Sequence, residues 1–197
     1  MSSIFVRPGV IEGFSGPMAS GKSSALLKRV DPLRWIAGKN FIGFKPETDN
    51  RERHCRSTEN FIDWIFIPKE RPEKIMEYIN QSHDLVAIDE IQFFDKKIVD
   101  IVLRLQKLMK NIIFAGLESN FRGEPFGSMK ELIFHANRLT KFHAICNICG
   151  EPAYYTQRMI NGKPADYNSP IILIETKNNN ESYEPRCFKH HEVPRKK

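Results

Sequence analysis

The sequence predicts an α/β fold, in which helices flank a parallel sheet and a small β-rich module follows. Up to about residue 141, apolar runs typical of buried parallel strands alternate with segments of helical periodicity. Beyond that point, short β-like runs punctuated by Gly, Pro and Asn replace the alternation. We therefore expect two domains, residues 1–141 and residues 142–197.

The first elements are a strand, a glycine-rich loop and a helix. Val10, Ile11 and Phe14 indicate a short strand, and residues 24–29 are good helix formers. The loop between them matches the pattern G-x-x-x-x-G-K-[ST] and reads Gly16-Pro17-Met18-Ala19-Ser20-Gly21-Lys22-Ser23. Its glycines let backbone N–H groups face one anion, its lysine reaches the outer phosphates of ATP, and its last hydroxyl can bind Mg²⁺. This order predicts a P-loop NTPase-type sheet, whereas a Gly/Ser surface turn before a helix is the simpler alternative.

The later elements follow the same alternation. We expect strands at residues 41–44, 85–88 and 112–116, and helices at residues 71–81 and 98–109, with a polar loop over residues 45–51. In the second domain, residues 153–156 and 171–174 are β-like.

Two acidic residues follow the predicted strand at residues 85–88. Asp89 stands where a Walker B carboxylate would hold Mg²⁺ together with Ser23. Glu90 comes next, and because side chains alternate along a strand it can face another part of the same cleft. We expect Glu90 to act as a general base on a substrate hydroxyl. The alternative is that either residue only caps the following turn.

Cysteine and histidine pairs in the second domain predict a metal site. Three thiolates and one imidazole suit a tetrahedral structural Zn²⁺, and the spacings C-x-x-C and C-x-x-H supply them from Cys146, Cys149, Cys187 and His190. A redox C-x-x-C motif is the rival interpretation, but the second pair favours zinc. His191 is adjacent to His190 and is the alternative fourth ligand, whereas Cys55 is left over as a free thiol.

Composition limits the remaining classes of function. The 197 residues suffice for one substantial core, and no apolar run approaches the ~20 residues of a membrane span. The N-terminus lacks an apolar signal region, so we expect a cytoplasmic protein. The net charge is +6, but the basic residues are dispersed apart from the last three, and we expect no nucleic-acid binding.

Together, these motifs resemble the type II (cellular, bacterial and poxviral) thymidine kinase family over residues 13–191. The loop Gly16-Pro17-Met18 is similar to that family's phosphate loop, and Lys45-Pro46 with Asp49 and Arg51 resembles its K-P-x-x-D-x-R segment. Further matching segments are Asp89-Glu90-Ile91-Gln92-Phe93-Phe94, residues 116–126, Cys146 to Gly150 and Tyr183 to Cys187.

The resemblance implies a role for each matching residue. Residues 16–23, Asp49, Arg51, Asp89 and Gln92 would form the ATP and Mg²⁺ site, and Glu90 would take the proton of the nucleoside 5′-hydroxyl. The zinc-closed segment would be a lasso over the nucleoside. The residues that would surround the base are Met18, Phe93, Leu117, Phe121, Phe126, Ile174 and Tyr183.

The implied activity is ATP-dependent phosphorylation of thymidine and deoxyuridine in nucleotide salvage. The resemblance also implies a homotetramer, with feedback by a deoxynucleoside triphosphate. Departures from the family pattern include Ala19 in place of a usual Phe, Glu118 in place of a usual Asp, and a lasso without its glycine pair at residues 175–180. A kinase of a different or modified deoxynucleoside therefore stays an alternative, as does a non-catalytic zinc- and nucleotide-binding regulatory protein.

Overall fold

A six-stranded parallel sheet forms the centre of the described chain. The computed structural model describes residues 8–36, 40–47, 62–172 and 181–195. Within them the strand order is β3-β2-β4-β5-β1-β6, and every neighbouring pair is parallel. The strands are β1 (Ile11–Ser15), β2 (Asn40–Glu47), β3 (Trp64–Pro68), β4 (His83–Ile88), β5 (Asn111–Gly116) and β6 (Arg138–Lys141).

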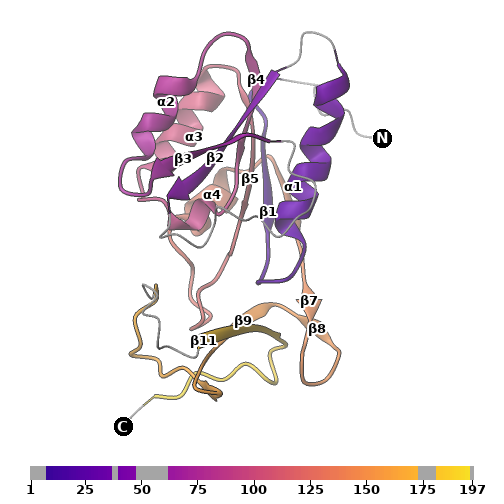
Figure 1. The fold of residues 1–197 in the computed structure, drawn as a ribbon, viewed down its shortest axis with the longest axis vertical. Coiled ribbons are helices and arrows are strands. Elements are labelled where there is room, and N and C mark those ends of the chain that lie inside the picture. The colour runs from indigo at the N-terminus through magenta and orange to yellow at the C-terminus, as the bar shows by residue number, and fades with distance from the viewer. Residues whose placement is uncertain (1–7, 37–39, 48–61, 173–180, 196–197) are drawn as a thin grey trace.

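Helices cover both faces of this sheet, which confirms the predicted α/β fold class (Figure 1). Helix α1 packs on one face, and α2, α3 and α4 pack on the other. Their bounds are α1 (Lys22–Val30), α2 (Ile75–Tyr78), α3 (Ile98–Lys107) and α4 (Met129–His135), with 3₁₀ turns η1 (Asp31–Trp35), η2 (Pro72–Lys74) and η3 (Ile91–Phe93).

Strand β5 shows why the sheet has two apolar faces. All six of its residues are buried. Ile112 and Phe114 join the core beneath α2, α3 and α4, whereas Ile113 and Ala115 join the core beneath α1. Because successive side chains point to opposite faces, a continuous apolar run is needed where helices cover both sides.

A small antiparallel module follows the sheet and lies beyond the carboxyl ends of its strands (Figure 1). One part is the pair β7 (Ala144–Ile145) and β8 (Pro152–Ala153). The other part has the strand order β10-β9-β11, with β9 (Tyr155–Ile160), β10 (Lys163–Pro164) and β11 (Glu181–Arg186). The predicted boundary at residue 141 coincides with the last residue of β6, and the division into two domains stays a prediction.

Several predicted elements were wrong in extent. Strand β2 continues through Lys45 and Pro46 to Glu47, because it pairs with β3 over these residues, which we expected to begin a loop. The expected helix at residues 71–81 is limited to η2 and α2, because the chain is extended at Ile79 and turns where the Ser82 N–H donates to the Asn80 side chain.

The β-like runs of the second domain also differ from the prediction. Residues 153–156 are divided between β8 and β9, with Tyr154 outside both strands. Ile171 and Ile172 form a bend and no strand, and the rest of that predicted run lies outside the described residues.

Candidate functional site

The phosphate-binding loop connects β1 to α1. Gly21 has φ 84° and precedes Lys22, the first residue of α1. Gly16 packs so closely on Phe142 that a Cβ atom would lie 2.6 Å from the carbonyl oxygen of that residue. Ala19 adopts a left-handed φ of 59°, which costs a non-glycine residue about 1 kcal/mol or more. The strain of this loop therefore lies at Ala19, whereas Gly16 and Gly21 adopt positive φ values that glycine tolerates.

Lys22 curls back over this loop. Its Nζ donates to the Pro17 carbonyl oxygen at 2.6 Å and to Ser20 Oγ at 3.3 Å, and the side chain is buried. Burial lowers the pKa of Lys22 below its ordinary value, although the nearby carboxylates of Glu90 and Asp89 oppose this shift. A buried ammonium group at the start of a helix suits a polyphosphate, because the negative phosphates would compensate its positive charge in place of water.

Asp89 follows β4 and joins three segments of the chain. Its Oδ1 accepts hydrogen bonds from Ser23 Oγ at 3.1 Å and from the Glu90 N–H at 3.0 Å. Its Oδ2 lies 3.0 Å from Lys45 Nζ, and both side chains of this ion pair are buried. Ser23 and Asp89 thus present two adjacent oxygen donors, which fits Mg²⁺, an ion that prefers oxygen ligands.

Lys45 is a site residue that the sequence analysis did not select. It lies near the carboxyl end of β2, next to β4 in the sheet, and its Nζ is 4.7 Å from the centre of the Trp64 ring. The sequence offered one signal, since Lys45 opens the K-P-x-x-D-x-R segment. Its pairing with Asp89 depends on the strand order, which joins residues 44 positions apart.

Glu90 stands at the same edge of the sheet with a strained backbone. Its φ is 53°, in the left-handed region that non-glycine residues rarely occupy. Gln92 Nε2 donates to Glu90 Oε2 at 2.6 Å, and Gln92 Oε1 accepts from the Leu117 N–H at 3.1 Å. Gln92 therefore orients the Glu90 carboxylate relative to the end of β5. Strain of this kind is typical of functional positions.

The residues expected around the base differ in where they lie. Phe93 and Phe126 contact each other edge to face, with ring centres 5.3 Å apart. Met18 is exposed, and its N–H donates to Thr156 Oγ1 in β9 at 3.0 Å. Phe121 is only 3% exposed, and the Arg158 guanidinium lies 5.0 Å from its ring centre. Phe121 is thus covered by protein, whereas Met18 is open to solvent.

Two further expected residues have clear positions. Leu117 follows β5 and is half-buried beside Gln92. Tyr183 lies in β11, where its hydroxyl donates to Glu181. Asp49, Arg51, Ile174 and Cys55 lie outside the described residues, so their expected roles stay predictions.

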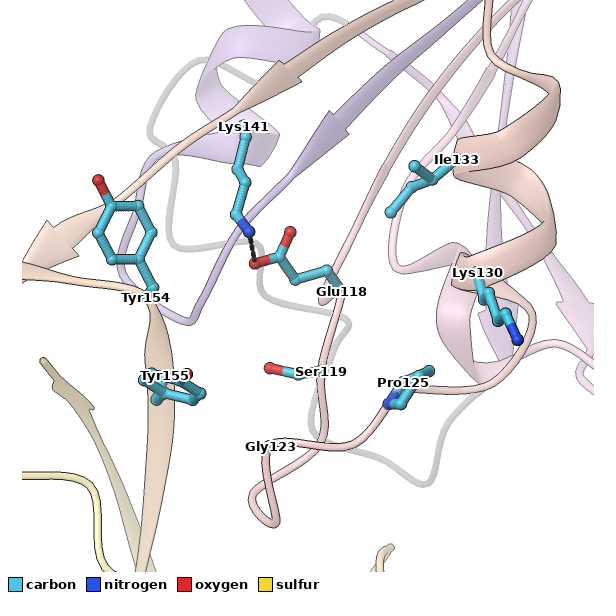
Figure 2. A pocket seen from close by; sticks show the side chains of 9 residues that line it. All are labelled: Glu118, Ser119, Gly123, Pro125, Lys130, Ile133, Lys141, Tyr154 and Tyr155. Atoms are coloured by element: carbon cyan, nitrogen blue, oxygen red, sulfur yellow. Dashed lines mark ion pairs between the residues drawn. The ribbon is translucent and has the colours of Figure 1, made fainter. Parts of the chain in front are cut away.

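An open cavity of about 390 Å³ is lined in part by the loop between Leu117 and Phe126 (Figure 2). Two of its lining residues form an ion pair, between Lys141 Nζ and Glu118 Oε1, which are 3.0 Å apart. Of the residues expected around the base, those that the structure describes do not line this cavity. Its lining residues are Glu118, Ser119, Gly123, Pro125, Lys130, Ile133, Lys141, Tyr154 and Tyr155.

The four predicted zinc ligands come together in the small module. The ligand atoms of Cys146, Cys149, Cys187 and His190 all lie within 4.8 Å of one another. Cys149 Sγ is 3.7 Å from Cys187 Sγ, and His190 Nδ1 is 3.3 Å from Cys187 Sγ and 3.7 Å from Cys146 Sγ. A tetrahedral Zn²⁺ with bonds of about 2.3 Å to sulfur separates two sulfur ligands by about 3.8 Å. The cluster is therefore compatible with a tetrahedral structural zinc site.

The pKa shifts of two cluster thiols go in opposite directions. A backbone hydrogen bond at Glu151 lowers the pKa of Cys149, but desolvation and the neighbouring thiols of Cys146 and Cys187 outweigh it, so this pKa is raised. Desolvation opposes ionisation of Cys146, but backbone N–H groups of Cys187, Ile148 and Cys149 and the His190 side chain outweigh it and lower the pKa of this thiol to about 5. Thiolates are the form that binds zinc.

The choice between the two adjacent histidines follows from their surroundings. His191 Nε2 hydrogen-bonds to the Phe121 carbonyl oxygen at 2.9 Å, and its ring stacks on Tyr155 with centres 4.6 Å apart. His191 therefore points away from the thiol cluster, and His190 completes it.

A comparison with known families adds to this geometry. A family model described as thymidine kinase matches residues 9–191. The chain belongs to the thymidine kinase family. Membership supports nucleoside kinase activity, which is a phosphotransferase reaction, and the use of ATP. The resemblance seen in the sequence is thereby confirmed over nearly the whole chain.

Comparison with solved structures gives a distant similarity. The crystal structure of the flagellar accessory protein FlaH from Methanocaldococcus jannaschii matches with 14% identity and a TM-score of 0.49. The match covers 79% of this thymidine kinase family member and 77% of FlaH.

In the described part of this thymidine kinase family member, every helix falls short of the length and apolarity that crossing a bilayer requires.

Proposed function

We propose that this chain transfers the γ-phosphoryl group of ATP to the 5′-hydroxyl of thymidine, and of deoxyuridine, in nucleotide salvage. One observation carries the proposal. Glu90 follows Asp89 in the sequence and donates its backbone N–H to the Asp89 carboxylate, which also accepts a hydrogen bond from Ser23 of the phosphate loop. An oriented carboxylate beside a phosphate site is the arrangement that phosphoryl transfer to a hydroxyl requires.

In the proposed reaction, the 5′-oxygen forms a bond to the γ-phosphorus while the bond from that phosphorus to the β,γ-bridging oxygen breaks. The bridging oxygen keeps the electron pair and leaves as part of ADP. The proton of the 5′-hydroxyl passes to a carboxylate oxygen of Glu90. Gln92 would position Glu90 for this step, because its side-chain N–H donates a hydrogen bond to Glu90 Oε2.

The charges of the site support the transfer. Lys22 neutralises the outer phosphates from within the loop, and the N-terminus of α1 adds the partial positive charge of its N–H groups. Ser23 and Asp89 would hold Mg²⁺, which neutralises phosphate charge when bound. Lys45 fixes Asp89 Oδ2, so that Oδ1 faces Ser23.

The base would lie among apolar side chains on the opposite side of Glu90 from the phosphates. The contact between Phe93 and Phe126 offers an aromatic wall beside η3, and Leu117 borders the same region. Flat apolar walls suit a pyrimidine because stacking buries its faces. Zinc would serve a structural role, since Cys146 and Cys149, between β7 and β8, and Cys187 and His190, after β11, would hold it together.

By family membership we also propose a cytoplasmic homotetramer that a deoxynucleoside triphosphate inhibits. The alternative substrate, a different or modified deoxynucleoside, is favoured by the departures from the family sequence at Ala19 and at residues 175–180, because the resemblance assigns base recognition to the lasso segment. A non-catalytic regulatory protein is the remaining alternative.

A nucleoside panel tests the proposal. Purified protein is mixed with ATP, Mg²⁺ and each of thymidine, deoxyuridine, deoxycytidine and the purine deoxynucleosides, and ADP formation is followed. We expect turnover with thymidine and deoxyuridine. Turnover restricted to another nucleoside would replace the substrate, and the absence of turnover with every nucleoside would refute the kinase assignment.

A further inference from the structure

The residues after the last zinc ligand read as a short basic tail, yet the structure anchors them. Glu192 donates its backbone N–H to Gln157 Oε1 at 2.8 Å and accepts from Gln157 Nε2 at its carbonyl oxygen at 2.9 Å. Gln157 lies in β9 and is 1% exposed. The Gln157 side-chain amide thus accepts from the backbone N–H of Glu192 and donates to its carbonyl oxygen, so a buried side chain of β9 holds the tail in place.

A second anchor lies two residues further along. The Pro194 carbonyl oxygen accepts from the Tyr167 N–H at 2.7 Å, and the Arg195 guanidinium lies 4.3 Å from the centre of the Tyr167 ring. The tail thus contacts the segment that follows β10 through a backbone hydrogen bond and through a side chain. We call residues 191–195 the C-terminal clasp.

Tyr167 also contacts the loop that follows β5. Its hydroxyl donates to Glu124 Oε1 at 2.5 Å, and the Arg122 guanidinium lies 4.6 Å from its ring centre. Arg122 Nη2 also donates to the Ser169 carbonyl oxygen at 3.0 Å. At the start of the clasp, His191 bonds the Phe121 carbonyl oxygen. Residues 121–124 are therefore held from two sides.

The turn at residues 120–124 belongs to the same loop as Leu117 and Phe126. Asn120 closes it, because its side-chain oxygen accepts from the N–H groups of Arg122 and Glu124. The loop is anchored at its start by the Gln92 amide, which also orients Glu90. A shift of the turn would therefore be transmitted to the apolar wall on the nucleoside side of the site.

We propose that the C-terminal clasp positions the 120–124 turn and thereby sets the affinity for the nucleoside, without contacting substrate or zinc. The inference rests on the proposed function for its substrate. Within the described residues, the contacts of the clasp go to Phe121, Tyr155, Gln157 and Tyr167 and not to the phosphate loop, Asp89 or the four zinc ligands, so we expect its main effect on the nucleoside side of the site.

The test compares Gln157→Leu with Glu192→Ala. The first removes both hydrogen bonds to the clasp and keeps the buried volume similar. The second removes an exposed side chain and leaves the backbone groups that Gln157 binds, so it serves as the matched control. A truncation that ends the chain at His191 removes both the Gln157 anchor and the Tyr167 anchor and keeps all four zinc ligands.

For Gln157→Leu and for the truncation, we expect faster amide hydrogen exchange in residues 120–124 and at Tyr167. We expect the nucleoside KM to rise on the order of 10-fold, since about two hydrogen bonds are lost, with the ATP KM and zinc content within twofold of the unaltered chain. Glu192→Ala should match the unaltered chain in every measurement.

Three results would overturn the inference. Unchanged exchange in residues 120–124 would show that the clasp does not hold the turn. Faster exchange with an unchanged nucleoside KM would make the clasp a purely structural feature, and loss of zinc with equal changes in both KM values would mean general unfolding. A failure of the proposed function differs from all three, because the unaltered chain would then show no turnover while the exchange measurement still reports on the clasp.

Discussion

Replacing Lys45 with methionine removes a buried positive charge and leaves most of the side-chain volume in place. Lys45 Nζ is 3.0 Å from Asp89 Oδ2, and the two side chains are 7% and 3% exposed. At this distance and an effective dielectric constant of about 20, two unit charges attract by about 5.5 kcal/mol. Desolvation of both groups offsets part of this attraction, so the Coulomb energy overstates the cost of the substitution. A better guide is the typical loss of stability when one partner of a buried ion pair is removed.

Loss of one partner from a buried pair typically costs about 3–5 kcal/mol, because the other charge stays buried. Asp89 retains hydrogen bonds from Ser23 and from the Glu90 N–H, which lower this cost. We therefore expect Lys45→Met to reduce the free energy of unfolding by about 3 kcal/mol. The melting temperature would fall by about 6–12 °C for a chain of this size.

Urea denaturation without nucleotide measures this change, and Lys28→Met provides the control. Lys28 is an exposed residue of α1, so its replacement should alter the free energy of unfolding by less than about 0.5 kcal/mol. Lys45→Arg keeps the charge and should recover most of the loss. The reasoning is refuted if Lys45→Met costs under about 1 kcal/mol, within the scatter of a surface substitution.

Further predictions concern backbone packing, zinc and one carboxylate. A Cβ at Gly127, where φ is 51°, would lie 2.1 Å from a backbone oxygen of η3, so Gly127→Ala should lower the free energy of unfolding by about 3 kcal/mol or more in urea denaturation. Gly162 also has a positive φ but open space around it, so Gly162→Ala should cost only about 1 kcal/mol. Equal costs for the two substitutions would contradict this prediction. Cys149→Ser should lose most of the expected one zinc per chain by metal analysis, and full zinc content would remove the proposed ligand set. The hydrogen bond from Tyr167 chiefly lowers the pKa of Glu124 below 4.5, so an NMR titration should show this pKa rising in Tyr167→Phe. Because the folded-state pKa is depressed, the stabilisation is present above about pH 4.5 and is lost as the pH falls through the folded-state value; an unchanged titration would exclude this hydrogen bond.

The parts of the fold that the sequence predicted are those with continuous apolar runs. Strands β4 and β5 are buried on both faces and read as such, and α3 shows helical spacing from Ile98 to Leu105. Strand β6 was missed because all four of its residues are exposed at the sheet edge, so no apolar pattern marks it. Strand β3 was also missed, although Trp64-Ile65-Phe66-Ile67 is a run of aromatic and β-branched residues that favours a strand.

The candidate site was predictable where neighbouring residues create it. The phosphate loop, Asp89-Glu90 and the two zinc-ligand pairs are local patterns, and the structure brings their members together as the spacing implies. Lys45 was missed because its partner, Asp89, follows a different strand, β4. The choice of His190 over His191 was likewise open in the sequence, because it depends on a hydrogen bond to Phe121, 70 residues away.

Glu90→Gln tests the central claim most directly. The substitution keeps the size of the side chain and an oxygen that can accept from Gln92, but it removes the carboxylate that would take the 5′-hydroxyl proton. We predict that kcat for thymidine falls by about 10²–10⁴-fold, while the dissociation constant for ATP, measured by calorimetry, stays within about threefold because the phosphate loop is untouched. A variant that keeps a kcat near that of the unaltered chain would contradict the account, since Glu90 would then not be the base at this site.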